Sequence, residues 1–91
     1  MAIFERDGHQ YLDYPYFRVT VWANAEHTQT RSFWASRRIL GGGKIAWHEC
    51  DETGLGLLRY IIVRYPVPAD VVEVQPAWLD ICHGKLVIFD R

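Results

Sequence analysis

The chain has 91 residues, which fits one domain, and 49% of them are apolar, enough to build a hydrophobic core. Ten basic and eleven acidic side chains give a net charge of −1, which excludes binding of nucleic acid or anionic membranes by global electrostatic attraction. Aromatic residues make up 14% of the chain, so we expect some rings to lie on the surface and to serve an interface or a ligand groove.

The N-terminal part of the chain predicts antiparallel strands. Asp7-Gly8 tolerates the positive φ angles of a two-residue turn, so we expect Ala2–Arg6 to pair with His9–Asp13. After this hairpin, Tyr16–Ala25 alternates apolar with polar residues, which is the period-two pattern of a half-buried strand.

The segment Thr30–Leu40 has two interpretations. Arg37 and Arg38 before a glycine are typical of the last turn of a short helix, which would give an α+β fold with a helix at about 31–40 packed on an antiparallel sheet. The alternative is a strand that Gly41-Gly42-Gly43 connects to the next strand in a hairpin. We favour the strand, because aromatic and β-branched residues are frequent in the segment and such a helix would be short.

Two more strands are expected before the C-terminal hairpin. Leu57–Tyr65 is nearly all apolar, which predicts a central strand covered on both faces, ended by Pro66 and Pro68. A short strand, Val71–Gln75, follows, and we expect Pro76 to end it because proline cannot donate a ladder hydrogen bond.

The last predicted element is a hairpin around His83-Gly84. A two-residue loop there would pair Cys82 with Lys85, Ile81 with Leu86, and Leu79 with Ile88. The four aliphatic residues of these pairs would share one face, which we expect to lie on the core.

Together these elements predict a mainly β fold, an antiparallel meander of hairpins that forms a small barrel or sandwich, as a single domain over 1–91. Neither a signal-peptide pattern nor an apolar run of membrane-spanning length is seen, so we expect a cytoplasmic protein without membrane association. Two cysteines are too few for a disulfide framework, and we expect both thiols to be reduced.

The stretch from Arg31 to Lys44 combines basic and aromatic residues and contains no acidic side chain. In the strand interpretation Arg37 lies opposite Trp47, and Ser36 lies opposite His48. We therefore predict a binding surface made of aromatic, basic and histidine side chains: Trp22, Trp34, Arg37, Arg38, Trp47 and His48. Single-stranded nucleic acid is held by such surfaces, although a cation–π contact between Arg37 and Trp47 is the simpler explanation.

Cysteine and histidine also occur together in two places, His48-Glu49-Cys50 and Cys82-His83. Zinc takes such ligands, but adjacent residues on a strand point to opposite faces and the spacing lacks a Cys-x2-4-Cys knuckle. The sequence leaves open whether Cys50, Cys82, His48 and His83 meet, and we predict no metal and no cofactor.

Catalytic signatures are absent from the sequence. His48 could act in acid–base chemistry with Glu49, Asp51 or Ser36, but no nucleophile elbow or metalloprotease motif accompanies it. The glycines of 41–43 lack the spacing of a phosphate-binding loop, and we expect them to form a turn.

Size, aromatic content and the lack of catalytic motifs favour a non-enzymatic interaction protein that acts as a homodimer. An unidentified protein partner is the other partner that these features allow. The alternatives are a small-ligand-binding β-barrel or cleft, a single-stranded nucleic-acid-binding module, and a small hydrolytic enzyme that uses His48.

Overall fold

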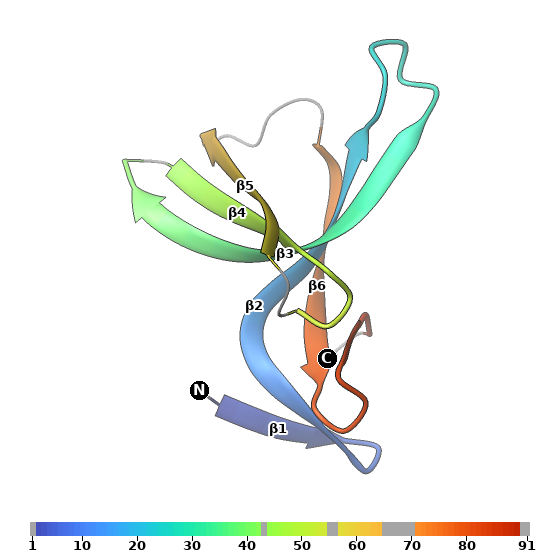
Figure 1. The fold of residues 1–91 in the computed structure, drawn as a ribbon, viewed down its shortest axis with the longest axis vertical. Helices are drawn as coiled ribbons and strands as arrows, with labels where there is room; N and C mark the ends of the chain where they lie inside the picture. The colour runs from blue at the N-terminus through green and yellow to red at the C-terminus, as the bar shows by residue number, and fades with distance from the viewer. Residues whose placement is uncertain (1, 43, 55–56, 65–70, 90–91) are drawn as a thin grey trace.

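The computed structural model describes residues 2–42, 44–54, 57–64 and 71–89, and for 38–40, 44–46 and 57–64 it describes the backbone alone (Figure 1). Secondary structure in this part of the chain consists of strands and turns. The strands are β1 (Ala2–Arg6), β2 (His9–Trp22), β3 (Thr30–Gly41), β4 (Lys44–Cys50), β5 (Leu57–Arg64), β6 (Val71–Asp80) and β7 (Lys85–Val87).

All seven strands belong to one antiparallel sheet with the order β5-β4-β3-β2-β6-β7, to which β1 adds by pairing with β2. The predicted mainly β, antiparallel fold is therefore confirmed. Among the described strands β1, β5 and β7 each have one neighbour, so the sheet is open and is not closed into a barrel. The alternative α+β fold is wrong, because 31–40 lies within β3, which forms hydrogen-bonded ladders with β2 on one edge and β4 on the other.

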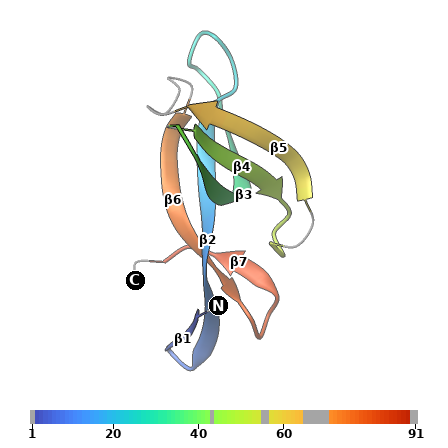
Figure 2. The ribbon, with the colours of Figure 1, turned by 90° about the vertical axis from the view of Figure 1, so that its left-hand side faces the viewer.

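The long strand β2 runs through the middle of the sheet and pairs with three other strands (Figure 2). One of its edges pairs with β6, while the other pairs first with β1 and then with β3. The change of partner falls at Tyr14-Pro15, where the register with β6 also shifts between Leu12 and Tyr16. A proline fits this irregularity because it has no N–H to leave unpaired.

Two predicted hairpins are confirmed with little change. Asp7 and Gly8 have φ angles of 52° and 78°, and the turn pairs Arg6 with His9 as expected. In the β3–β4 hairpin the predicted pairs of Ser36 with His48 and Arg37 with Trp47 are present. The register then shifts, so that Gly41 rather than Leu40 faces Lys44.

The strand β5 lies at the edge of the sheet, whereas its apolar sequence predicted a central strand. Its backbone pairs with β4 from Arg64, opposite Lys44, to Leu57, opposite Cys50. Residues 65–70, which include Tyr65 and both predicted strand-ending prolines, lie outside the described residues.

The strand β6 continues through Pro76 instead of ending at Gln75. Pro76 pairs with Phe17 of β2, and on its other side β7 reaches only as far as Trp78. A proline in a strand is tolerated where its missing N–H would face an unpaired edge, which explains why the strand is not interrupted here.

The predicted register of the C-terminal hairpin is wrong. Lys85 pairs with Asp80 and Leu86 with Leu79, so the loop contains residues 81–84 rather than two residues. The backbone N–H of Gly84 donates to the carbonyl of Asp80 at 2.7 Å, which closes this wider loop. As a result Ile81 is 41% exposed and lies outside the core that it was expected to join.

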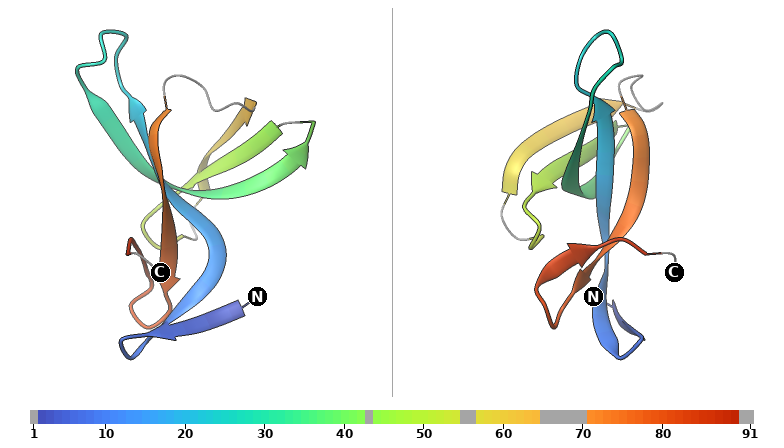
Figure 3. Two further views of the ribbon diagram at one scale, coloured as in Figure 1. Left: turned by 180° about the vertical axis from the view of Figure 1, so that it is seen from behind. Right: turned by 90° about the vertical axis from the view of Figure 1, so that its right-hand side faces the viewer.

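Figure 3 shows the open, twisted sheet from two further sides. Buried side chains form two clusters, which the strand register places on opposite faces of the sheet. One contains Tyr16, Cys50, Ala77 and Leu86, and it joins β2, β4, β6 and β7. The other contains Val19, Ala35 and Trp47, with partly buried side chains from β2, β3 and β6 around it. The backbone N–H of Leu86 donates to the carbonyl of Glu52 at 2.7 Å, which ties β7 to the turn after β4.

Candidate functional site

The predicted binding surface is divided between the two faces of the sheet. Because side chains alternate along a strand, Arg37 and its cross-strand partner Trp47 share the face of Ala35. Trp34 and His48 point to the opposite face, which the buried Tyr16 also occupies. The structure therefore brings Arg37 together with Trp47 but separates this pair from Trp34 and His48.

Two arginines of this region, Arg31 and Arg37, are stacked on rings of the same sheet. The guanidinium carbon of Arg37 lies 4.4 Å from the ring centre of Phe17 and 5.8 Å from that of Trp47, as a cation–π pair requires. Arg31 lies 4.7 Å above Phe33 and also forms an ion pair with Glu49 at 3.1 Å. These contacts give Arg31 and Arg37 intramolecular partners.

Trp22 lies at the end of β2, and its ring stacks on His27 with a centre-to-centre distance of 4.8 Å. The adjoining loop is organised by Asn24, whose side-chain oxygen accepts the backbone N–H groups of Thr28 and Gln29. This loop is why β2 ends at Trp22 and not at Ala25. The side chain of Arg38 lies outside the described part of the structure.

Two of the residues suggested as partners of His48, Ser36 and Glu49, lie on different faces of the sheet. Ser36 does face His48, but Glu49 points to the other face, where it contacts Arg31. Cys50 is buried in the core, whereas Cys82 is exposed in the loop after β6. Among the described residues, the histidine, cysteine and acidic side chains that come together are a different set.

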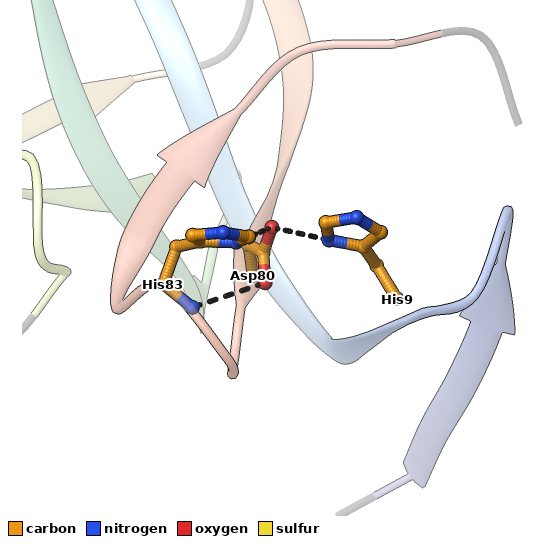
Figure 4. Close-up of side chains that lie close together, drawn as sticks. All are labelled: His9, Asp80 and His83. Carbon is orange, nitrogen blue, oxygen red and sulfur yellow. Dashed lines mark hydrogen bonds and ion pairs between the residues drawn. The ribbon is translucent and has the colours of Figure 1, made fainter.

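That set is His9, Asp80 and His83, shown in Figure 4. The carboxylate oxygen Oδ2 of Asp80 lies 3.1 Å from Nδ1 of His9 and 2.9 Å from Nδ1 of His83. The two imidazole rings are stacked, with ring centres 5.1 Å apart and an interplanar angle of 21°. Two histidines thus converge on a single carboxylate oxygen.

The sheet creates this cluster from distant parts of the sequence. His9 is the first residue of β2 after the Asp7-Gly8 turn, and Asp80 is the last residue of β6. Pairing of Tyr11 with Asp80 places the two strand ends side by side.

The Asp80 carboxylate is fixed by the loop that follows it. Its Oδ1 accepts the backbone N–H groups of Cys82 at 3.1 Å and His83 at 3.3 Å, while Oδ2 faces the two rings. Asp80 is only 5% exposed, and burial opposes its ionisation, but the hydrogen bonds from His83 and His9 outweigh this effect and lower the pKa of the carboxyl group. The carboxylate is therefore a buried, oriented anion.

An aromatic cluster packs beside these three residues. Phe89 stacks on Trp78 at 4.5 Å and contacts Tyr11 at 4.8 Å, while Tyr11 also stacks on Phe4 at 5.5 Å. The ring of His9 continues this row, at 6.3 Å from Tyr11. The cluster holds the β1–β2 hairpin against the C-terminal hairpin, and thereby holds His9 near Asp80.

Sequence reasoning missed this site because it assigned His83 to a two-residue turn. The local signal was present: an Asp three residues before His83, followed by Gly84, is typical of a loop in which the carboxylate caps backbone N–H groups. The contribution of His9 depends on the β2–β6 pairing, which joins residues 71 positions apart and leaves no local pattern.

A shallow depression lies at the irregular part of the β2–β6 pair. It encloses about 320 Å³ and is lined by aromatic residues, prolines, an alanine and one acid: Asp13, Tyr14, Pro15, Tyr16, Phe17, Pro76, Ala77 and Trp78. It lies next to Pro15, where the register of β2 with β6 shifts between Leu12 and Tyr16.

No model of a known protein family matches the chain, and no curated protein and no solved structure matches it either. A search of the described residues for a helix long and apolar enough to cross a membrane finds none.

Proposed function

We propose that the protein is a non-enzymatic interaction protein that works as a homodimer, and that a second copy binds along β5. The observation that carries the proposal is the mismatch between the sequence of β5 and its place in the sheet. Apart from Arg59 and Arg64, the strand consists of Leu, Tyr, Ile and Val, yet it lies at the edge, paired with β4 alone among the described strands.

An apolar edge strand of this length is a template for pairing with another chain. The backbone N–H and C=O groups on the outer side of an edge strand can form hydrogen bonds with a strand of another chain. Folded proteins normally protect such edges by charges, prolines or a covering segment. Pairing of β5 with its own copy would use the same surface on both chains, which gives a closed dimer with two-fold symmetry. A second copy of the chain is therefore the partner that fits the edge most simply.

The dimensions of the monomer support the same proposal. The radius of gyration is 14.0 Å, whereas a compact chain of this length would have a radius of about 12 Å. In the described part of the chain no large side chain is fully buried. The described side chains thus leave surface that association could bury.

The proposal is tested by native mass spectrometry and light scattering on the tag-free protein between low and high micromolar concentration. We expect a dimer, and we expect Ile61→Lys or Ile62→Lys to give a folded monomer, because a lysine blocks edge pairing. The two positions are adjacent along β5, so the two variants test a lysine on each face of the strand. Ile3→Lys, at an exposed position of β1, is the matched control and should remain dimeric. A monomeric wild-type protein at high concentration would contradict the proposal.

The depression around Tyr14 and Trp78 favours small-ligand binding as a second candidate function. Its volume of about 320 Å³ is at the lower end of the range for ligand sites, and half of its lining residues are aromatic. A bound aromatic metabolite should change the fluorescence of Trp78. This ligand-induced change should be absent in Trp78→Phe. If no compound in a metabolite screen changes the fluorescence of the wild-type protein, this candidate is lost.

A further inference from the structure

We infer that His9, Asp80 and His83 form a binding site for a divalent transition-metal ion, and that Zn²⁺ is the ion that fits the site best. The site is separate from β5, so this inference does not depend on the proposed dimer. It rests on the donor set, on the distances between the donor atoms and on how the protein holds Asp80.

The donor set is two imidazole nitrogens and one carboxylate oxygen. Imidazole is a ligand of Zn²⁺, Cu²⁺, Ni²⁺ and Fe²⁺, whereas Ca²⁺ and Mg²⁺ prefer oxygen ligands alone. Two histidines with one carboxylate, plus a water molecule at the fourth position, is a recurring ligand set of zinc sites that bind substrates. The chemistry of the three side chains thus selects a borderline ion rather than an alkaline-earth ion.

The distances are close to those of a coordination sphere. Donor atoms about 2.0–2.1 Å from a tetrahedral zinc ion lie roughly 3.3–3.4 Å from one another. Both Nδ1 atoms already lie at 3.1 Å and 2.9 Å from Oδ2 of Asp80, and all three donor atoms lie within 4.8 Å. Small rotations of the two rings about Oδ2 would admit an ion between the three atoms.

The site is also oriented before any ion binds. Oδ1 of Asp80 accepts the backbone N–H groups of Cys82 and His83, which leaves Oδ2 directed at the rings, as Figure 4 shows. Hydrogen bonds of this kind to ligating carboxylates raise metal affinity by fixing the ligand. The side chains of His9 and His83 are 40% and 57% exposed, so that an ion has a path from solvent and its fourth position is accessible to water.

A hydrogen-bonded His–Asp–His network without metal is the competing explanation. In such a network each ring donates an N–H to Oδ2, and the three side chains only stabilise the contact between the two hairpins. The two explanations differ in one observable, because only a metal site gains affinity for Zn²⁺ from both rings together.

The experiment is isothermal titration of the tag-free, chelator-treated protein with ZnCl₂, with Co²⁺ absorption spectra as a second readout. We expect one ion per chain, the visible bands of a four-coordinate Co²⁺ site, and a rise of several degrees in the melting temperature with saturating Zn²⁺. His9→Gln and His83→Gln keep a hydrogen-bond donor but remove a ligand, so each should lower the affinity by more than tenfold.

His27→Gln is the matched control, because His27 belongs to the β2–β3 loop and stacks on Trp22. It should bind Zn²⁺ as the wild type does. Circular dichroism checks that each variant is folded. No Zn²⁺ uptake by the folded wild type would overturn the inference. Equal affinities of the wild type, His9→Gln and His83→Gln would overturn it as well.

Discussion

Two features require glycine at position 54, its backbone conformation and the nearby ring of Tyr16. Its φ angle is +74°, and a Cβ atom built there would lie 3.0 Å from Cζ of Tyr16. The Tyr16 hydroxyl donates to the carbonyl of Gly54 at 3.0 Å, so the ring cannot move away without losing this bond. Tyr16 itself is part of the buried cluster that joins four strands.

Gly54→Ala is therefore expected to destabilise the fold more than Gly8→Ala does. Both glycines have a positive φ, and the left-handed conformation alone costs an alanine about 1–2 kcal/mol. Nothing lies within 4 Å of a Cβ at Gly8, whereas at Gly54 the displacement of Tyr16 adds to the loss. Urea unfolding of the two variants measures the difference, and equal losses would contradict this account.

The two cysteines should differ in reactivity. Burial, followed by the negative charges of Asp51 and Glu49, raises the pKa of the Cys50 thiol to about 11. At pH 8 only roughly one Cys50 thiol in a thousand is then ionised, and the thiolate is the reactive form. Cys82 is exposed.

In a titration of the native protein with a thiol reagent at pH 8, we expect one fast-reacting thiol, and the second only after unfolding. Cys82→Ser should remove the fast phase, and Cys50→Ser should leave it unchanged. The reactivity of Cys50 should increase as the pH rises towards 11, because its raised pKa shifts formation of the reactive thiolate to higher pH. A fast phase that survives in Cys82→Ser would refute this assignment.

At the scale of the element, the β3–β4 hairpin determines what Trp47 does. Register places Trp47 on the face of the second buried cluster, where it is 6% exposed and contacts the edge of Phe17 at 5.5 Å. The sequence placed the same residue on a binding surface. The structure makes it part of the core.

We therefore expect Trp47→Ala to cost about 3–5 kcal/mol, which is a large part of the stability of a small domain. Trp22→Ala is the control, because the Trp22 ring is only partly buried and stacks on a loop histidine. Its cost should be markedly smaller. Thermal or urea unfolding measures both values, and a mild effect of Trp47→Ala would show that the second cluster is not a true core.

Local chemistry made the turns predictable and left the partners of the strands open. Asp7-Gly8 and Gly41-Gly42 fix their hairpins because positive φ angles are needed there. The C-terminal loop escaped prediction because its width depends on hydrogen bonds to Asp80, which compete with a two-residue turn. The edge position of β5 follows from which strands pair across the sheet, and no pattern within β5 encodes it.

At the scale of the whole molecule, both the fold and the cluster of His9, Asp80 and His83 depend on the pairing of β2 with β6. This pair joins the first quarter of the chain to the last, and the contact between His9 and Asp80 spans 71 positions. The described part of the chain contains no helix that could pack on β2 and stabilise it before its strand partners are in place. A long loop must therefore close before the central contacts of the molecule form.

Refolding should consequently be slow for a chain of this size. Proteins dominated by such distant pairings fold in milliseconds to seconds, whereas small helical proteins fold in microseconds to milliseconds. Stopped-flow dilution from urea, followed by tryptophan fluorescence, measures the rate. Trp78 lies on β6 beside the β1–β2 hairpin, so its signal reports the late contact between the two ends of the chain. Complete recovery of that signal within the dead time would mean that the N-terminal and C-terminal hairpins meet before the β2–β6 ladder forms.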